Sequence, residues 1–217
     1  MYGLALCAGV GGLELGISAA VPNYRAVCYV ERGAYVSSLL AARMEAGDLP
    51  PAPIYSDLRS FDGRPWRGVV DLVSAGYPCQ PFSVAGSRAG ADDPRHLWPE
   101  VYRIIREVRP RLVFLENVPG HLSMGFGDVL GDLAAAGYAA EWGVFSAAEV
   151  GAPHLRKRLF CLAFSDAYSG GRQEQREPKP GGQQGQRGRE PHRLRQGREQ
   201  PHPAKTAGRW GVEPNVG

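Results

Sequence analysis

The sequence predicts an α/β protein with a doubly wound, mostly parallel β-sheet and a C-terminal β-hairpin. Three observations support this fold class. Short apolar runs alternate with segments of helical apolar spacing from residue 3 to residue 164. One run, residues 69–75, is nearly continuous, which is typical of a strand buried on both faces of a parallel sheet. The last two apolar runs are neighbours in the sequence and are expected to pair as a hairpin.

The first half of this pattern predicts three strands and two helices. A strand over residues 3–8 leads through a glycine-rich turn into a helix at 12–20. A second strand at 25–30 precedes a helix at 35–45, in which apolar residues recur at spacings of three and four. A group of prolines then breaks the chain before a brief strand at 54–55.

The second half predicts four strands and two helices. The first helix stops before Pro110, because the residue before a proline disfavours the helical conformation. The second helix ends at Gly137, a residue type that often follows the last helical turn. The expected strands are 69–75, 112–115, 139–145 and 158–164, and the expected helices are 97–108 and 129–136.

The composition changes near residue 165 and divides the chain into a folded domain, 1–165, and a low-complexity basic tail, 166–217. The 52 residues of the tail include 10 Gly, 7 Gln and 6 Pro, and few large apolar side chains. Such a segment buries too little apolar surface to offset its loss of conformational entropy. The tail carries 10 basic and 6 acidic residues, against 15 and 16 in the domain. We expect 166–209 to lack stable order and 210–217 to begin another ordered element.

Several classes of protein are excluded by the composition. No apolar run reaches the ~18 residues that a membrane span needs. The N-terminus lacks the basic start and the cleavage site of a signal peptide. The four cysteines lack the spacing of a disulfide framework or a zinc site, which predicts a metal-free protein of a reducing compartment such as the cytoplasm.

A nucleoside site is predicted at the carboxyl ends of the first three strands. The turn at 8–12 contains Gly9, Gly11 and Gly12, which permit a ligand to approach the backbone closely. Glu31 ends the second strand, where a carboxylate can accept hydrogen bonds from ribose hydroxyls, and Asp57 follows the third strand. Residue 14 is Glu, where the dinucleotide fingerprint has its third Gly, so a cofactor without phosphates such as S-adenosylmethionine fits better.

Two further strands end in reactive side chains. Cys79 lies in a loop directly after the strand at 69–75, between turn-forming and polar neighbours, whereas the other cysteines lie within apolar runs. Glu116 ends the next strand and is 37 residues further along the chain. A right-handed crossover places two such strands side by side, ~4.8 Å apart, so thiol and carboxyl would meet in one cleft. The alternative for Glu116 is a salt bridge to a nearby arginine.

Arg156 and Arg158 form a third polar segment. Their alternation at the start of a strand would point both side chains to one face. Paired guanidinium groups suit a phosphate or a ring oxygen. The alternative is that they only protect an edge strand against aggregation.

Taken together, these motifs resemble those of the cytosine-5 DNA methyltransferases over residues 2–164, in the order found in that family. The resemblance rests on the glycine-rich loop, the Pro-Cys-Gln loop, the Glu-Asn-Val segment and the Arg-x-Arg segment. It implies an S-adenosylmethionine-binding, Rossmann-like catalytic domain that acts on double-stranded DNA in restriction–modification. The implied catalytic residues are Cys79, Glu116, Arg156 and Arg158; the implied cofactor-binding residues are Gly9, Gly11, Gly12, Glu31, Asp57, Pro78, Leu97 and Asn117.

The implied reaction agrees with the residue types. A thiolate at Cys79 would attack carbon 6 of cytosine and make carbon 5 nucleophilic enough to accept a methyl group. We expect burial to raise the pKa of Glu116, so that the carboxyl either holds a proton or shares one with N3 of the base. The base must first leave the duplex, and Gln80, Ser83 and Arg88 are candidates to contact DNA near the vacated position.

Four features depart from the family pattern. Cys7 replaces a common aromatic residue and His154 replaces a common Gln. The last family segment, an Asn-containing motif on a helix that packs beside the first strand, is absent, and no target-recognition domain is evident. Two expectations follow: either the tail is a very small target-recognition region, or the chain is a fragment of a longer enzyme that acts with a separate C-terminal piece or subunit. The composition of residues 210–217 favours a fragment.

Two other functions stay open. The first is methylation of cytosine in tRNA, because the Pro-Cys-Gln loop alone does not distinguish the two substrates and a basic tail can bind either polymer electrostatically. A truncated chain can also bind S-adenosylmethionine or DNA without turnover. Methylation of duplex DNA compared with tRNA separates these possibilities.

Overall fold

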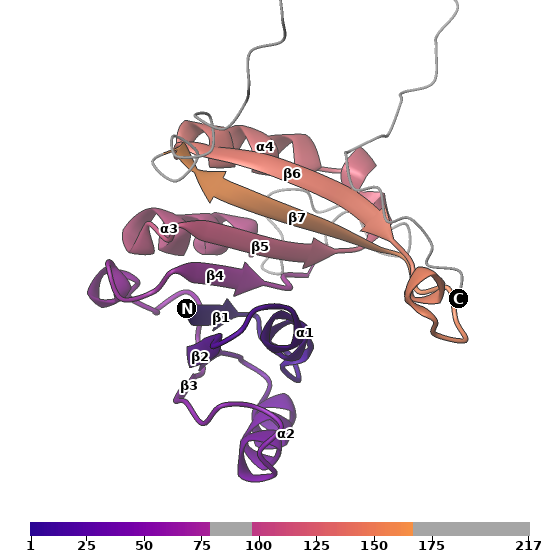
Figure 1. Cartoon of the computed structure of the whole chain (residues 1–217). Helices are drawn as coiled ribbons and strands as arrows, with labels where there is room; N and C mark the ends of the chain where they lie inside the picture. The colour runs from indigo at the N-terminus through magenta and orange to yellow at the C-terminus, as the bar shows by residue number, and fades with distance from the viewer. Residues whose placement is uncertain (79–96, 167–217) are drawn as a thin grey trace, which may run out of the picture.

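The computed structural model describes residues 1–78 and 97–166. In these residues seven strands form one sheet in the order β3-β2-β1-β4-β5-β7-β6 (Figure 1). The strands are β1 (Tyr2–Leu6), β2 (Arg25–Val30), β3 (Ile54–Tyr55), β4 (Leu72–Ala75), β5 (Leu112–Asn117), β6 (Tyr138–Phe145) and β7 (Arg158–Ser165). The α-helices are α1 (Gly12–Ala20), α2 (Ala34–Glu45), α3 (Trp98–Val108) and α4 (Phe126–Ala135), and the 3-10 helices are η1 (Arg64–Trp66), η3 (Pro119–Ser123) and η4 (Ala147–Val150).

The predicted fold class is confirmed. Strands β1 to β5 are parallel to one another, whereas β7 is antiparallel to both β5 and β6. The predicted hairpin is therefore present, with β7 inserted between β5 and β6. The carboxyl ends of β1, β2, β4 and β5 all lie at one edge of the sheet.

Two predicted strands are too long. The strand expected at 69–75 begins only at Leu72, because the N–H groups of Val69 and Val70 bond to the carbonyl of Trp66 and close a turn. Val69 is 51% exposed, so its apolar character did not indicate a buried strand. The strand expected at 3–8 ends at Leu6, because Cys7 has a φ of 49° and leaves the extended conformation.

Alternating side chains of the sheet enter two apolar cores. Leu4 and Leu6 of β1 face the core under α3 and α4, while Ala5 between them faces the core under α1 and α2. Helices α3 and α4 thus cover one face, and α1 and α2 cover part of the other (Figure 1). α3 has a sharply divided surface, with Val101, Ile104, Ile105 and Val108 fully buried.

The second face is covered unevenly. The register places Ser74, Phe114, Leu162 and Glu141 in one row across β4, β5, β7 and β6. The β4 end of this row lies under α1, where Glu14 bonds to Ser74, whereas Phe114 and Leu162 line an open groove.

Residues 1–78 and 97–166 contain no helix with the length and apolarity to cross a membrane, and no group of three or more potential metal ligands. The last described residue, Asp166, lies at the predicted domain boundary. The predicted tail lies outside the described residues apart from this one position.

Candidate active site

The loops that follow β1, β4 and β5 meet at Gly76. A Cβ atom at Gly76 would lie 3.5 Å from Glu116 Oε2 and 3.7 Å from the carbonyl oxygen of Cys7. Cys7 begins the glycine-rich turn, Gly76 begins the loop that leads to Cys79, and Glu116 is near the end of β5. The parallel register of β1, β4 and β5 therefore brings the three predicted motifs to one point, as expected at the carboxyl ends of an open α/β sheet.

Glu31 connects the glycine-rich turn to the start of α2. The N–H of Gly9 donates to its Oε2 at 2.9 Å, and the N–H of Gly33 donates to its Oε1 at 2.8 Å. A carboxylate oxygen can accept two hydrogen bonds, so each oxygen of Glu31 retains capacity for one hydroxyl of a diol. The carboxylate is thus held in a fixed position directly after β2.

The turn itself requires glycine at two positions. Gly9 and Gly11 have φ values of 54° and 77°, in the left-handed region that disfavours other residues. A Cβ at Gly11 would overlap the Leu49 side chain, whereas a Cβ at Gly9 or Gly12 would meet no atom within 4 Å. The space above Gly9 and Gly12 is therefore open, which is what a bound nucleoside needs.

Cys7 lies at the strained start of the same turn. Its φ of 49° is unusual for a residue with a side chain. Burial raises the pKa of the Cys7 thiol to about 12, with a smaller contribution from the Glu31 charge. The thiol therefore stays protonated and acts as a small apolar group.

The two other predicted cofactor positions lie at the ends of elements. Asp57 follows β3, and its carboxylate accepts hydrogen bonds from the N–H of Arg59 and the hydroxyl of Ser60. Leu97 precedes α3, and its carbonyl accepts from Val101 in the first turn. Both residues have a fixed local structure.

Asn117 joins β5 to the loop after β4. Its side-chain amide donates to the carbonyl of Tyr77 at 3.1 Å, and its Oδ1 accepts from the N–H of Val118 at 2.9 Å. Asn117 is only 6% exposed, so both polar ends of the amide are satisfied inside the protein.

Pro78, which follows Tyr77, is exposed.

Glu116 and Arg158 form an ion pair, with 2.8 Å between Oε1 and Nε. The two side chains come from adjacent antiparallel strands and are 25% and 24% exposed. Glu116 is thus partly buried, and its immediate partner is a charged guanidinium. The alternative of an arginine partner is therefore present, and that partner is itself a predicted site residue.

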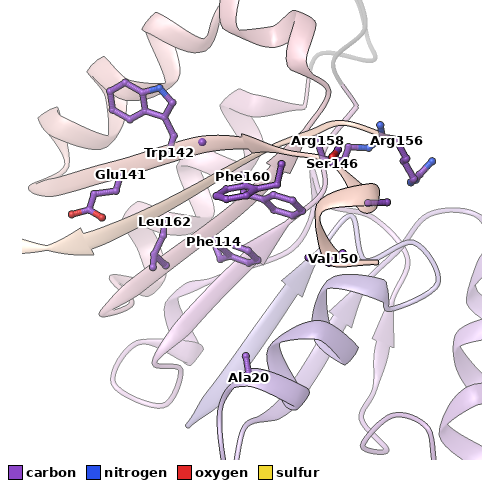
Figure 2. Close-up of a pocket in the computed structure, with 13 residues that line it drawn as sticks. Ala20, Phe114, Glu141, Trp142, Ser146, Val150, Arg156, Arg158, Phe160 and Leu162 are labelled. Carbon is purple, nitrogen blue, oxygen red and sulfur yellow. The ribbon is translucent and has the colours of Figure 1, made fainter. Parts of the chain in front are cut away.

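Arg156 lies outside β7, which begins at Arg158, and its φ is 31°. The prediction that strand alternation aligns the two arginines is therefore wrong. Both side chains nevertheless lie at one end of an apolar groove of about 790 Å³ (Figure 2). The groove continues past Phe160, Phe114 and Leu162 along the uncovered face of the sheet (Figure 2).

Cys79, Gln80, Ser83 and Arg88 lie outside the described residues. Their roles stay predictions that rest on the residues around them.

The arrangement found here agrees with the family comparison. The model of the C-5 cytosine-specific DNA methylase family matches residues 1–206. The chain belongs to this family. Curated members include the type II methyltransferase M.NgoMIV of Neisseria gonorrhoeae, 35% identical over 170 residues, and M.NaeI of Lentzea aerocolonigenes, 32% identical over 172 residues.

The matches cover only part of these relatives. Each alignment includes 76% of this chain, but 52% of M.NgoMIV and 40% of M.NaeI. The chain thus spans about half or less of their length. The crystal structure of the S. pombe Dnmt2 methyltransferase has the same fold, with a TM-score of 0.63 at 21% identity over 76% of this chain and 51% of that one.

Sequence analysis assigned no role to Tyr77 or His121, which lie beside the candidate site, and it named Trp98 only as the neighbour of Leu97. Tyr77 and His121 are buried and hydrogen-bonded to each other, and Trp98 donates from Nε1 to Asp132 at 2.7 Å. The position of Tyr77 directly before Pro78 was a usable signal. No local pattern marked His121, because its partner is 44 residues away.

Proposed function

We propose that this chain carries the catalytic domain of a DNA (cytosine-5-)-methyltransferase that uses S-adenosylmethionine. The observation that carries the proposal is the Glu116–Arg158 ion pair beside Gly76, three residues before Cys79. The cysteine can attack the ring of a cytosine, and the neighbouring carboxyl and guanidinium groups can hold that ring by hydrogen bonds while it is protonated. Family membership supports the same reaction.

The cofactor site would be built on the glycine-rich turn. Glu31 would accept hydrogen bonds from the ribose hydroxyls, Gly9, Gly11 and Gly12 would leave room for the nucleoside, and Asp57 would contact the adenine. Leu97, Pro78 and Asn117 would shape the remaining walls. When bound, S-adenosylmethionine supplies an electrophilic methyl group.

The chain's own residues then act on cytosine. The Cys79 thiolate forms a bond to carbon 6, and the displaced electron pair makes carbon 5 nucleophilic. N3 takes up a proton from water, and the Glu116 carboxylate accepts a hydrogen bond from the protonated N3 and so limits the charge on the ring. Arg158, with Arg156 beside it, orients Glu116 and the base. After carbon 5 is methylated, water takes up its proton, the electron pair of that bond restores the double bond between carbons 5 and 6, and the bond between carbon 6 and Cys79 breaks to release the thiolate.

Methyl transfer from labelled S-adenosylmethionine to mixed-sequence duplex DNA tests this proposal. Label should appear in cytosine, and Cys79→Ala should abolish it while the variant still binds the cofactor. Cys28→Ala is the matched control, because Cys28 is buried within β2 and away from the turn. Transfer that survives Cys79→Ala would refute the assignment of the nucleophile.

The alternative substrate is cytosine in tRNA. The same assay with tRNA in place of DNA separates the two, since one polymer should accept label much faster. Binding of S-adenosylmethionine or DNA without transfer would instead favour a binding protein.

We propose that a helix from a separate C-terminal piece or subunit covers the groove at Phe114, Phe160 and Leu162. These apolar side chains lie beside α1, whose Ala20 lines the edge of the groove, while α1 and α2 cover the adjacent half of the same face. A helix there would complete the second layer. Adding the C-terminal region of a relative in trans should raise transfer, and Leu162→Asp should abolish that gain.

The division into a catalytic domain at 1–165 and a tail at 166–217, DNA contacts by Gln80, Ser83 and Arg88, and a cytoplasmic location stay predictions.

A further inference from the structure

Tyr77 is anchored more firmly than its place in a loop requires. It follows β4 by two residues, yet it is only 4% exposed. Its carbonyl accepts from Asn117, and its ring packs on Trp98 and on the edge of His121, with centroid distances of 5.4 and 5.7 Å. Its hydroxyl lies 3.0 Å from His121 Nε2 in a buried contact.

The partner of His121 on its other side assigns the tautomer. His121 Nδ1 lies 2.8 Å from the carbonyl oxygen of Met124, which can only accept. Nδ1 therefore carries the proton, and in the neutral ring Nε2 is left as an acceptor. The hydroxyl of Tyr77 must then donate to Nε2.

This hydrogen bond connects two elements that flank the site. His121 belongs to η3, which follows directly after Glu116, Asn117 and Val118. Tyr77 is separated from Cys79 only by Pro78, whose ring fixes one backbone angle. Because only two peptide units separate the Cα atoms of residues 77 and 79, the position of Tyr77 sets where the cysteine loop begins.

We propose that His121 is a positioning residue for the Cys79 nucleophile and acts through the Tyr77 hydroxyl. The inference rests on the proposed function, because it assumes that Cys79 reacts. His121 does not touch the base; it holds the residue from which the cysteine loop departs. A displacement of about 1 Å at a reacting group can cost up to about 100-fold in rate, so a buried anchor here affects turnover.

The test begins with the contact itself, in the full chain and without a methylation assay. Ring ¹⁵N shifts should show a protonated Nδ1 and an unprotonated Nε2 at His121, and Tyr77→Phe should move the Nε2 signal. The amides of His121 and Met124 are in backbone hydrogen bonds, so their exchange reports on η3. Tyr77→Phe should speed that exchange about 2- to 10-fold. An unprotonated Nδ1, or unchanged exchange, overturns the proposal.

The second stage measures kcat and KM for methyl transfer to DNA and so separates an effect on positioning from an effect on stability. Tyr77→Phe and His121→Phe should each lower kcat about 3- to 10-fold with KM for S-adenosylmethionine unchanged, and the double variant should be no worse than either single one. His121→Gln, which keeps an acceptor near the place of Nε2, should recover part of kcat.

Tyr102→Phe is the matched control, because Tyr102 also stacks on Trp98, at 5.9 Å, but belongs to α3 and is not bonded to His121. The same loss of kcat in Tyr102→Phe, additive losses in the double variant, or a parallel rise of KM overturns positioning. Transfer that survives Cys79→Ala would instead refute the proposed nucleophile, while the contact measured by ¹⁵N shifts and exchange would stand.

Discussion

Three glycines in one turn permit backbone strain, steric overlap and helix propensity to be measured separately. Gly9→Ala adds a methyl group at a φ of 54° where no atom lies within 4 Å, so only the left-handed conformation opposes it. That conformation costs ~1–2 kcal/mol for a residue with a Cβ. Gly11→Ala meets the same penalty at 77° and also overlaps Leu49, which is only 2% exposed and cannot easily move. Overpacking adds ~1–3 kcal/mol.

The expected losses in free energy of unfolding are therefore about 1–2 kcal/mol for Gly9→Ala and about 2–5 kcal/mol for Gly11→Ala. Gly12→Ala is the matched control, since Gly12 is exposed, begins α1 without a positive φ and has open space around it. It should gain about 0.4–1 kcal/mol by restricting the unfolded chain. Urea unfolding followed by circular dichroism measures all three.

Cofactor binding tests whether the open space at Gly9 is the space that the nucleoside occupies. A methyl group at Gly9 enters the space proposed for the nucleoside, and a clash of ~1.4 kcal/mol there weakens S-adenosylmethionine binding about tenfold. Titration calorimetry on the folded variants tests this. The reasoning fails if Gly12→Ala destabilises as much as Gly11→Ala, or if Gly9→Ala binds the cofactor as tightly as the parent.

Three further predictions follow from buried polar groups. Burial raises the pKa of Glu14, so the free energy of unfolding should fall as pH rises above the usual carboxyl range. Urea titrations between pH 4 and 8 measure this fall, which should be smaller in Glu14→Gln. Trp98→Phe removes the indole N–H that donates to the Asp132 carboxylate at 2.7 Å, and should lower the free energy of unfolding by ~1–3 kcal/mol in thermal unfolding. Adding Asp132→Asn to Trp98→Phe should cause no further loss. Because burial raises the pKa of Cys7 to about 12, iodoacetamide at pH 8 should leave Cys7 unmodified in the folded chain, as peptide mass spectrometry can verify.

Local patterns were sufficient for most of the elements. Helix α1 and strands β2 and β3 have the predicted bounds, and the crossover argument correctly placed the strand before Cys79 beside the strand of Glu116. The failures occurred where hydrophobicity and backbone conformation disagree. Val69 is apolar but lies in a turn, and Arg156 alternates with Arg158 in sequence but has a positive φ outside the strand.

The sequence by itself determined the class of sheet, the order of its motifs and the residues of the glycine-rich turn, because these depend on periodicity and on residue types that are close along the chain. The tertiary structure decided which side chains are partners. Glu116 is paired with Arg158, Glu31 with Gly9 and Tyr77 with His121 across 42, 22 and 44 residues. Such contacts depend on strand order, register and the direction of each side chain, and no local pattern records these.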